Sequence, residues 1–310
     1  MTLARRPVTG AAALGKQGLI QLAVLVVALA IQLGWKMGQE FSSVACAAIL
    51  LFGLPHGTLD LEIIKRERGA GRSAMAALLL LYVALAVGVY LLWQISSVVA
   101  LSAFLIVAVI HFAEDWEDAG SPFLAQGMAL ALLSAPALLH LSELEEIFGY
   151  LSGGEGGALI ANLMMLFAPV SLLVAGVCVS TLWQTGRRDQ ALAGAAVLAG
   201  MLLLPPIVGF ALFFCVFHSP RHLTDAVARV AQAPNARSVV LCLTLAALGI
   251  ATALFRLEVR ADFSSQIATA SFMTLSILTV PHMLVPFFAR FDFRGRAAGT
   301  AFARFKEFVK

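Results

Sequence analysis

The sequence predicts an all-α fold, a polytopic membrane helical bundle, and three observations lead to that prediction. Hydrophobic residues make up 60% of the 310 residues, and charged residues make up only 13%, against about a quarter in a soluble domain. The mean hydropathy is +0.91. The apolar residues also gather in long runs joined by short loops. A chain of this composition cannot cover a water-facing surface, so we expect a single integral membrane domain over residues 1–310.

About ten of the apolar runs are expected to cross the membrane, because a helix needs roughly 20 apolar residues to span the hydrocarbon core. They lie near 18–37, 41–57, 74–94, 97–113, 122–140, 157–183, 190–204, 206–219, 238–255 and 266–289. The second, seventh and eighth runs are short, which is normal where a helix breaks at a buried site. Arg5, Arg6 and Lys16 precede the first run without a clear cleavage site, which predicts a retained first helix.

The distribution of basic residues predicts the orientation, since Lys and Arg are enriched in cytoplasmic loops. If the N-terminus is cytoplasmic, 18 of the 21 basic residues fall in inside segments, and only Lys36, Arg256 and Arg260 fall outside. The acidic stretch 142–146 also falls outside. We therefore expect both termini to be cytoplasmic. The net charge of +3 is small and no basic tract is dense, so nucleic acid is not an expected partner.

Three segments outside the spans are expected to lie at the membrane surfaces. Segment 219–237 is predicted to form an amphipathic helix at the inner surface, with Ser219 as its N-cap and Pro220 in its first turn. Segment 143–150 is predicted to be a short outer helix. The tail 301–306 alternates apolar and basic residues, which suits a membrane surface.

Five of the six histidines lie at the edges of apolar runs, at His56, His111, His218, His222 and His282. The predicted topology places all five at a similar depth near the cytoplasmic face. The sixth, at position 140, ends the fifth run on the opposite side. Ionisable side chains at membrane depth are costly and by default indicate function. We therefore predict that these five histidines share one site.

The residue types at this site favour a redox metal over structural zinc. Neutral imidazole suits zinc, copper, iron and nickel, and no cysteine accompanies the group. His218 and His222 have i, i+4 spacing, which puts both rings on one face of a continuous helix. Asp60 and Asp115 each follow a histidine by four residues, and each is placed to accept the far N–H of a ligand ring.

Aromatic residues crowd the same segments and predict an apolar pocket that opens to the bilayer. A metal beside such a pocket suggests chemistry on a lipid-soluble substrate. The residues alone leave other readings open, namely a haem protein or another histidine-metal membrane redox enzyme, and a transporter with its site near the membrane centre. The expected pocket residues are Phe112, Phe213, Phe214, Phe217 and Phe287.

The histidine segments, in this order and setting, resemble those of the Brp/Blh family of bacterial and archaeal membrane proteins, the β-carotene 15,15′-dioxygenases. The resemblance covers about residues 45–290, and Leu61 departs from it where some relatives carry a further histidine. The matching residues are Pro55-His56-Gly57 with Asp60, His111-Phe112 with Asp115, His218-Ser219 with Arg221-His222, and Pro281-His282.

The resemblance implies an iron(II) held by His56, His111, His218 and His222, with His282 behind the ligands or beside the substrate. It implies cleavage of the central 15,15′ double bond of β-carotene with O₂ to give two all-trans-retinal molecules. It further implies a multi-pass protein of the cell membrane, here a bacterial inner membrane, and a functional link to a retinylidene protein that uses the retinal.

Overall fold

The computed structural model describes residues 17–35, 39–53, 59–68, 71–230, 236–257 and 263–289. Every element in these ranges is helical, which confirms the predicted all-α fold. In chain order they are α2 (Gln17–Trp35), α3 (Gln39–Ala48), η1 (Ile49–Gly53), α4 (Asp60–Arg68), α5 (Arg72–Ile95), α6 (Ser97–Ala113), η3 (Glu114–Ala119), α7 (Pro122–Ser134), α8 (Pro136–Leu139), α9 (Leu141–Ser152), α10 (Glu155–Gln184), α11 (Arg188–Leu203), α12 (Pro206–Leu212), η4 (Phe213–His218), α13 (Ser219–Val230), α14 (Ala236–Leu257) and α15 (Phe263–Ala289).

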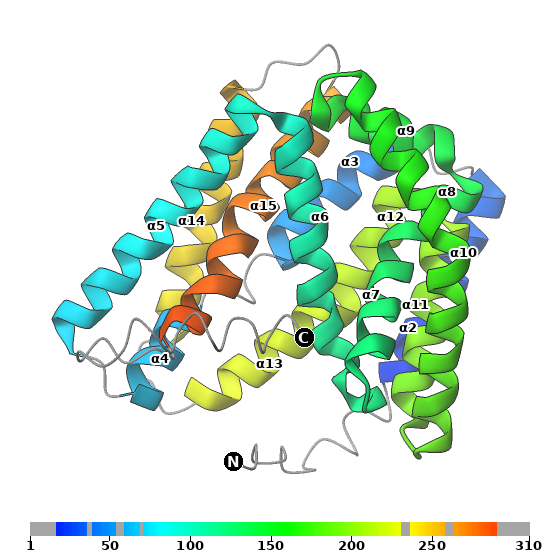
Figure 1. Cartoon of the computed structure of the whole chain (residues 1–310), viewed down its shortest axis with the longest axis horizontal. Helices are drawn as coiled ribbons and strands as arrows, with labels where there is room; N and C mark the ends of the chain where they lie inside the picture. Colours follow the sequence, from blue (N-terminus) through cyan, green and yellow to red (C-terminus); the bar gives the residue numbers. More distant parts are fainter. Residues whose placement is uncertain are drawn as a thin grey trace.

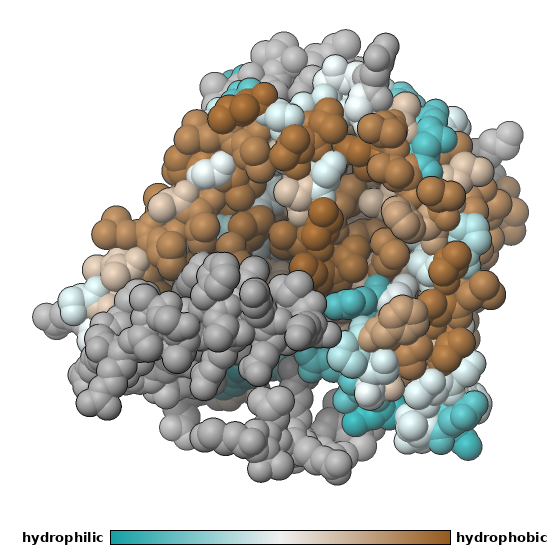
Figure 2. Space-filling model, viewed as in Figure 1, coloured by the Kyte–Doolittle hydropathy of each residue, from teal (hydrophilic) through white to brown (hydrophobic). Residues whose placement is uncertain are grey.

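Six helical stretches in the described ranges are long and apolar enough to cross a membrane. Figure 2 shows the apolar surface across the middle of one face, with hydrophilic residues toward its margins. The predicted helical membrane bundle is confirmed. The count of ten crossings and the cytoplasmic position of both termini stay predictions, since the termini lie outside the described residues. The six are Ser73–Ile95, Ser97–Ala119, Pro122–Leu139, Gly156–Gln184, Pro206–Val230 and Phe263–Val285.

Short helices cover the two ends of the bundle (Figure 1). At the upper end lies α9, which packs against α10, α6 and α15, and it forms where a short helix over 143–150 was predicted. At the lower end lie α13 and α4, which pack against each other. The C-terminal end of α6 and the start of α13 meet in this lower half, and both carry predicted site residues.

Glycines allow the helices around the upper end to approach closely, as is common in membrane bundles. A Cβ on Gly157 in α10 would lie 2.3 Å from the backbone nitrogen of Gly149 and 2.5 Å from the carbonyl carbon of Phe148, both in α9. These atoms are backbone, so no side-chain rotation can relieve the overlap. A Cβ added to Gly176, also in α10, would meet no other atom within 4 Å.

We therefore expect Gly157→Ala to destabilise the protein by about 1–3 kcal/mol, because α9 must move away from α10. The measurement is thermal unfolding of the purified protein in detergent, read as a lowered Tm. Gly176→Ala is the matched control, and its Tm should stay level or rise because alanine favours a helix by about 1 kcal/mol over glycine. Equal Tm values for the two variants would contradict this close packing.

Four buried hydroxyl groups lie along the part of α15 that precedes His282. The side chains of Thr269, Ser271, Thr274 and Ser276 are all buried and donate to carbonyls of their own helix. The indole nitrogen of Trp93 in α5 donates to the hydroxyl oxygen of Ser276 at 2.7 Å. This bond ties α5 to α15, and so fixes the helix that carries His282.

Candidate metal centre

The end of α6 supplies the first two polar groups of the centre. His111 lies in the last turn of α6 and Asp115 in the 3₁₀ turn η3 that follows, and both are buried. The turn ends at Gly120, whose φ of +76° is the left-handed conformation that glycine adopts without strain. A buried carboxylate is costly unless it is paired, so the partners of Asp115 are informative.

A π-helical turn, η4, supplies the next ring. His218 is its last residue and is fully buried, and α13 continues directly from it to His222. The N–H of Ser219 bonds the carbonyl of Phe214, five residues earlier. This wider turn accommodates Pro220, which has no N–H and whose ring would clash with a carbonyl in a regular helix. Such π-turns are frequent at functional sites.

The structure corrects the prediction that Ser219 is the N-cap of a separate helix. Its backbone is helical, with φ of −62° and ψ of −44°, so the chain does not restart there. Its hydroxyl instead donates to the carbonyl oxygen of Phe52 in η1 at 2.8 Å. Ser219 therefore ties α13 to the segment that leads to the predicted ligand His56.

The rings of His111, His218 and His222 lie close together. The carboxylate of Asp115 lies between the rings of His218 and His222. The Nδ1 of His218 lies 2.7 Å from one carboxylate oxygen of Asp115, and the Nε2 of His222 lies 3.2 Å from the other. The Nε2 of His218 faces the Nε2 of His111 at 3.1 Å. The ring centroids of His218 and His222 are 4.4 Å apart. Asp115, His218 and His222 each offer one ligand atom, and these three atoms lie within 4.8 Å of one another.

A second carboxylate–histidine pair adjoins this cluster. His282 of α15 donates through Nδ1 to the carboxylate of Asp60, in the first turn of α4. Its ring centroid lies 5.1 Å from that of His111. The two carboxylates thus contact rings from distant segments, whereas the spacing suggested partners four residues earlier. Asp115 contacts His218 and His222, and Asp60 contacts His282.

Two donors from other helices hold the turn that carries Asp115. The backbone carbonyl oxygen of Asp115 accepts from the side-chain amide of Gln190 at 2.8 Å and from the guanidinium of Arg221 at 2.9 Å. The carboxylate of Asp118 pairs with Arg187 at 2.9 Å. Carbonyls at a helix end lack partners within the helix, so these side chains satisfy the turn and fix where its carboxylate points.

Other predicted residues lie outside this cluster or outside the described part of the chain. Residues 54–58, with His56, and the side chain of Phe287 lie outside the described residues, as does segment 301–306. His140 follows α8, at the end of α7 remote from the cluster, and its Nδ1 lies 3.3 Å from a carboxylate oxygen of Glu143. The membership of His56 in the ligand set therefore stays a prediction.

Aromatic rings surround the histidines. Phe214 stacks on His218 with centroids 5.4 Å apart, and Phe112 meets the same ring edge-on at 4.9 Å. Phe213 is buried 5.8 Å from it. Phe217 points away and stacks on Trp116 at 5.1 Å. Of the predicted pocket residues with described side chains, Phe112 lines an adjacent cavity, and the other three pack behind it.

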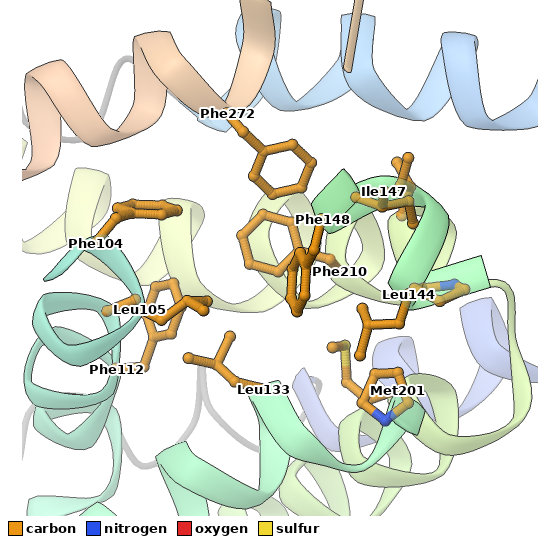
Figure 3. A pocket seen from close by; sticks show the side chains of 14 residues that line it. Phe104, Leu105, Phe112, Leu133, Leu144, Ile147, Phe148, Met201, Phe210 and Phe272 are labelled. Carbon is orange, nitrogen blue, oxygen red and sulfur yellow. The ribbon is translucent and has the colours of Figure 1, made fainter. Parts of the chain in front are cut away.

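This apolar cavity of about 50 Å³ lies beside the aromatic shell (Figure 3). Its fourteen lining residues are apolar and come from seven helices, α6 to α9, α11, α12 and α15. Sequence reasoning missed most of them. The register of α6 held one signal, because Phe104 and Ala108 precede Phe112 by two turns and one turn on the same helix face. The lining also includes Phe148, Met201, Phe210 and Phe272.

The donor set fits a metal ion. A carboxylate can only accept, so Asp115 fixes the proton of His218 on Nδ1 and leaves its Nε2 with a lone pair. Because that Nε2 faces the Nε2 of His111 at 3.1 Å, a proton or a cation must lie between them. Two nitrogens at about 2.1 Å from one ion, with a right angle between the bonds, are about 3 Å apart. The pair is therefore spaced for one shared ion.

The fold and the site define a class, a polytopic helical membrane protein with a buried histidine–carboxylate cluster suited to a metal, beside a dry apolar cavity. A family model described as "Beta-carotene 15,15'-dioxygenase" matches residues 47–288. The chain belongs to this family of enzymes, as its histidine segments predicted. The match includes all five histidines of the predicted site.

One curated relative also matches, a protein of an uncultured marine bacterium, 66A03, named "Beta-carotene 15,15'-dioxygenase". It is 29% identical over 257 residues, which cover 78% of this chain and 91% of the relative. No solved structure shows a significant match.

Proposed function

We propose that this chain cleaves the central 15,15′ double bond of β-carotene with O₂ to give two molecules of all-trans-retinal. One C=C bond breaks, and each of its carbons ends as an aldehyde carrying one oxygen atom, so one O₂ balances the reaction. The family, the name of the relative and a dry cavity beside a histidine cluster support the proposal. The observation that carries it is the facing Nε2 pair of His111 and His218.

In this proposal, His56, His111, His218 and His222 would hold an iron(II). When bound, the iron would supply the redox chemistry that lets O₂ react with a carbon–carbon double bond. The described histidines of the site are His111, His218, His222 and His282, and they come from three separate segments. Such convergence needs the whole bundle to be folded. The two carbons of the cleaved bond supply all the electrons that O₂ accepts, so no further reductant is required.

The protein's own groups position and shield this chemistry. Asp115 accepts from His218 and His222 and holds both rings in one orientation. Gln190 and Arg221 hold Asp115 in turn. Asp60 orients His282, which we place beside the ligands on the substrate side. The surrounding phenylalanines exclude water, and they hold the polyene so that its central bond lies at the cluster.

The cellular setting follows from the same proposal. The substrate partitions into the lipid bilayer, and the predicted topology puts the cluster near the cytoplasmic face of a bacterial inner membrane. The retinal formed would then be available to a retinylidene protein in the same membrane.

The direct test is retinoid analysis by HPLC in a bacterial strain that accumulates β-carotene. We expect loss of the orange colour and the appearance of retinal, without shorter or longer apocarotenals, when the chain is expressed. The strain carrying His111→Ala serves as the control and should keep its β-carotene. Intact β-carotene in a strain whose membranes contain the wild-type protein and iron would overturn the proposal.

A further inference from the structure

Aromatic rings lie between the cavity of Figure 3 and the histidine cluster, and they contact both. Phe210 lines the cavity and stacks on Phe214 with an interplanar angle of 13° and centroids 5.4 Å apart. Phe214 stacks in turn on His218 at 14°. Phe112, which also lines the cavity, meets His218 edge-on. A row of stacked rings therefore runs from the cavity to the candidate metal centre.

The lining residues give the extent of the cavity along α6 and the position of its opposite wall. Its lining on α6 runs from Phe112 back to Phe104, about 12 Å of helix at 1.5 Å per residue. Figure 3 shows Leu144, Ile147 and Met201 on the side of the pocket opposite Phe104 and Phe112. Leu144 and Ile147 belong to α9, the short helix over the upper end of the bundle.

We propose that this cavity binds one ring-bearing end of the carotenoid, and that its α9 wall fixes which double bond reaches the metal. The proposal rests on the proposed function and names a subsite for it. The conjugated chain would run past the edges of the stacked rings of Phe210, Phe214 and His218, and the terminal ring would stop against Leu144 and Ile147. Distance from that stop to the cluster then selects the central bond.

The lining favours a bulky apolar occupant. Cavities without polar groups stay dry and accept apolar guests. The open space of about 50 Å³ is less than a ring with its polyene arm requires, so the lining side chains must move apart on binding. Met201 is flexible enough to do so. Fourteen apolar side chains from seven helices offer more contact surface than a diatomic gas can use, which argues for the carotenoid over O₂ as the occupant.

The first test enlarges the cavity at its α9 wall. Leu144→Ala deepens the cavity under α9, so the substrate slides and other double bonds reach the cluster. We expect the ratio of eccentric apocarotenals to retinal to rise at least about tenfold over wild type, since small displacements of a substrate have effects of this size or more. Leu151→Ala is the matched control, because Leu151 is buried in the same helix and does not line the cavity. It should give retinal alone.

The second test fills the cavity and needs no turnover. Ala108→Phe places a ring in the space beside Phe112, so metal-free protein purified in detergent should bind β-carotene about tenfold more weakly than wild type. Absorbance titration measures this binding, and its result holds even if the wild type forms no retinal. Unchanged binding would overturn the proposal, as would exclusive retinal formation by Leu144→Ala. A raised KM for O₂ with unchanged carotenoid binding would assign the cavity to gas and overturn it equally.

Discussion

Replacing His218 with alanine is expected to abolish retinal formation, a loss of at least about a hundredfold. Removal of an outer partner of a ligand already costs 10- to 100-fold in affinity or activity, and this ring is proposed as a ligand itself. The change also leaves the fully buried carboxylate of Asp115 without its 2.7 Å partner. HPLC of retinoids in the β-carotene-accumulating strain measures the effect. His56→Ala, His111→Ala and His222→Ala should behave alike.

Two variants separate the loss of a ligand from the loss of the fold. His218→Gln keeps a hydrogen-bond donor for Asp115 but supplies no imidazole, so it should accumulate in the membrane and remain inactive. His140→Ala should keep most of the activity, because His140 lies beside Glu143 and away from the cluster. Retained turnover in His218→Gln would remove this residue from the ligand set.

Asp115→Asn is expected to weaken iron binding by about 10–100-fold, with a parallel loss of activity at limiting iron. The carboxylate accepts from two rings, one on each oxygen. An amide has one acceptor and one donor group, so one of the two rings would face an N–H and turn or change its tautomer. Titration of metal-free protein with iron(II) under anaerobic conditions measures the affinity.

The control for Asp115→Asn is Asp225→Asn, which makes the same chemical change at an exposed position of α13, one turn after His222. Its iron affinity should stay within about twofold of wild type, since exposed charges contribute little. Equal affinities for the Asp115→Asn variant and the wild type would mean that the carboxylate does not orient the ligands.

The helices and the gathering of histidines could be predicted from the sequence because both depend on composition. Long apolar runs favour helices wherever the solvent is lipid, and each predicted run corresponds to a helix in the described ranges. The scarcity of ionisable groups made the histidines stand out. The ring centroid of His111 lies 4.8 Å from that of His218 and 5.1 Å from that of His282, and the ring centroids of His218 and His222 are 4.4 Å apart. His56 lies outside the described residues, so the predicted site of five stays a prediction.

The pairing of carboxylates with rings could not be predicted, because it depends on local changes of helix type. A spacing of four residues aligns side chains only on an α-helix. The chain turns into a 3₁₀ helix after Ala113, with three residues per turn, so Asp115 no longer faces His111. The π-turn over 213–218 likewise directs Phe217 toward Trp116. Neither change leaves a clear pattern in the sequence.

The cavity could not be predicted from the sequence either, because the side chains that line an apolar pocket are of the same types as those that face lipid. Phe104 and Phe210 line the cavity, while Phe123 and Phe167 are exposed on the outside of α7 and α10. Only the packing of seven helices distinguishes the two environments. The predicted aromatic pocket was therefore near the site, but most of its walls come from other residues.

Iron content of the purified protein tests the central claim most directly, namely that this histidine cluster is the metal centre. Mass spectrometry of the metal, set against protein concentration, should give about one iron per chain for the wild type and for His140→Ala, and less than about a tenth of that for His218→Gln. Iron retained in full by His218→Gln, or retinal formation by an iron-free wild type, would contradict this assignment.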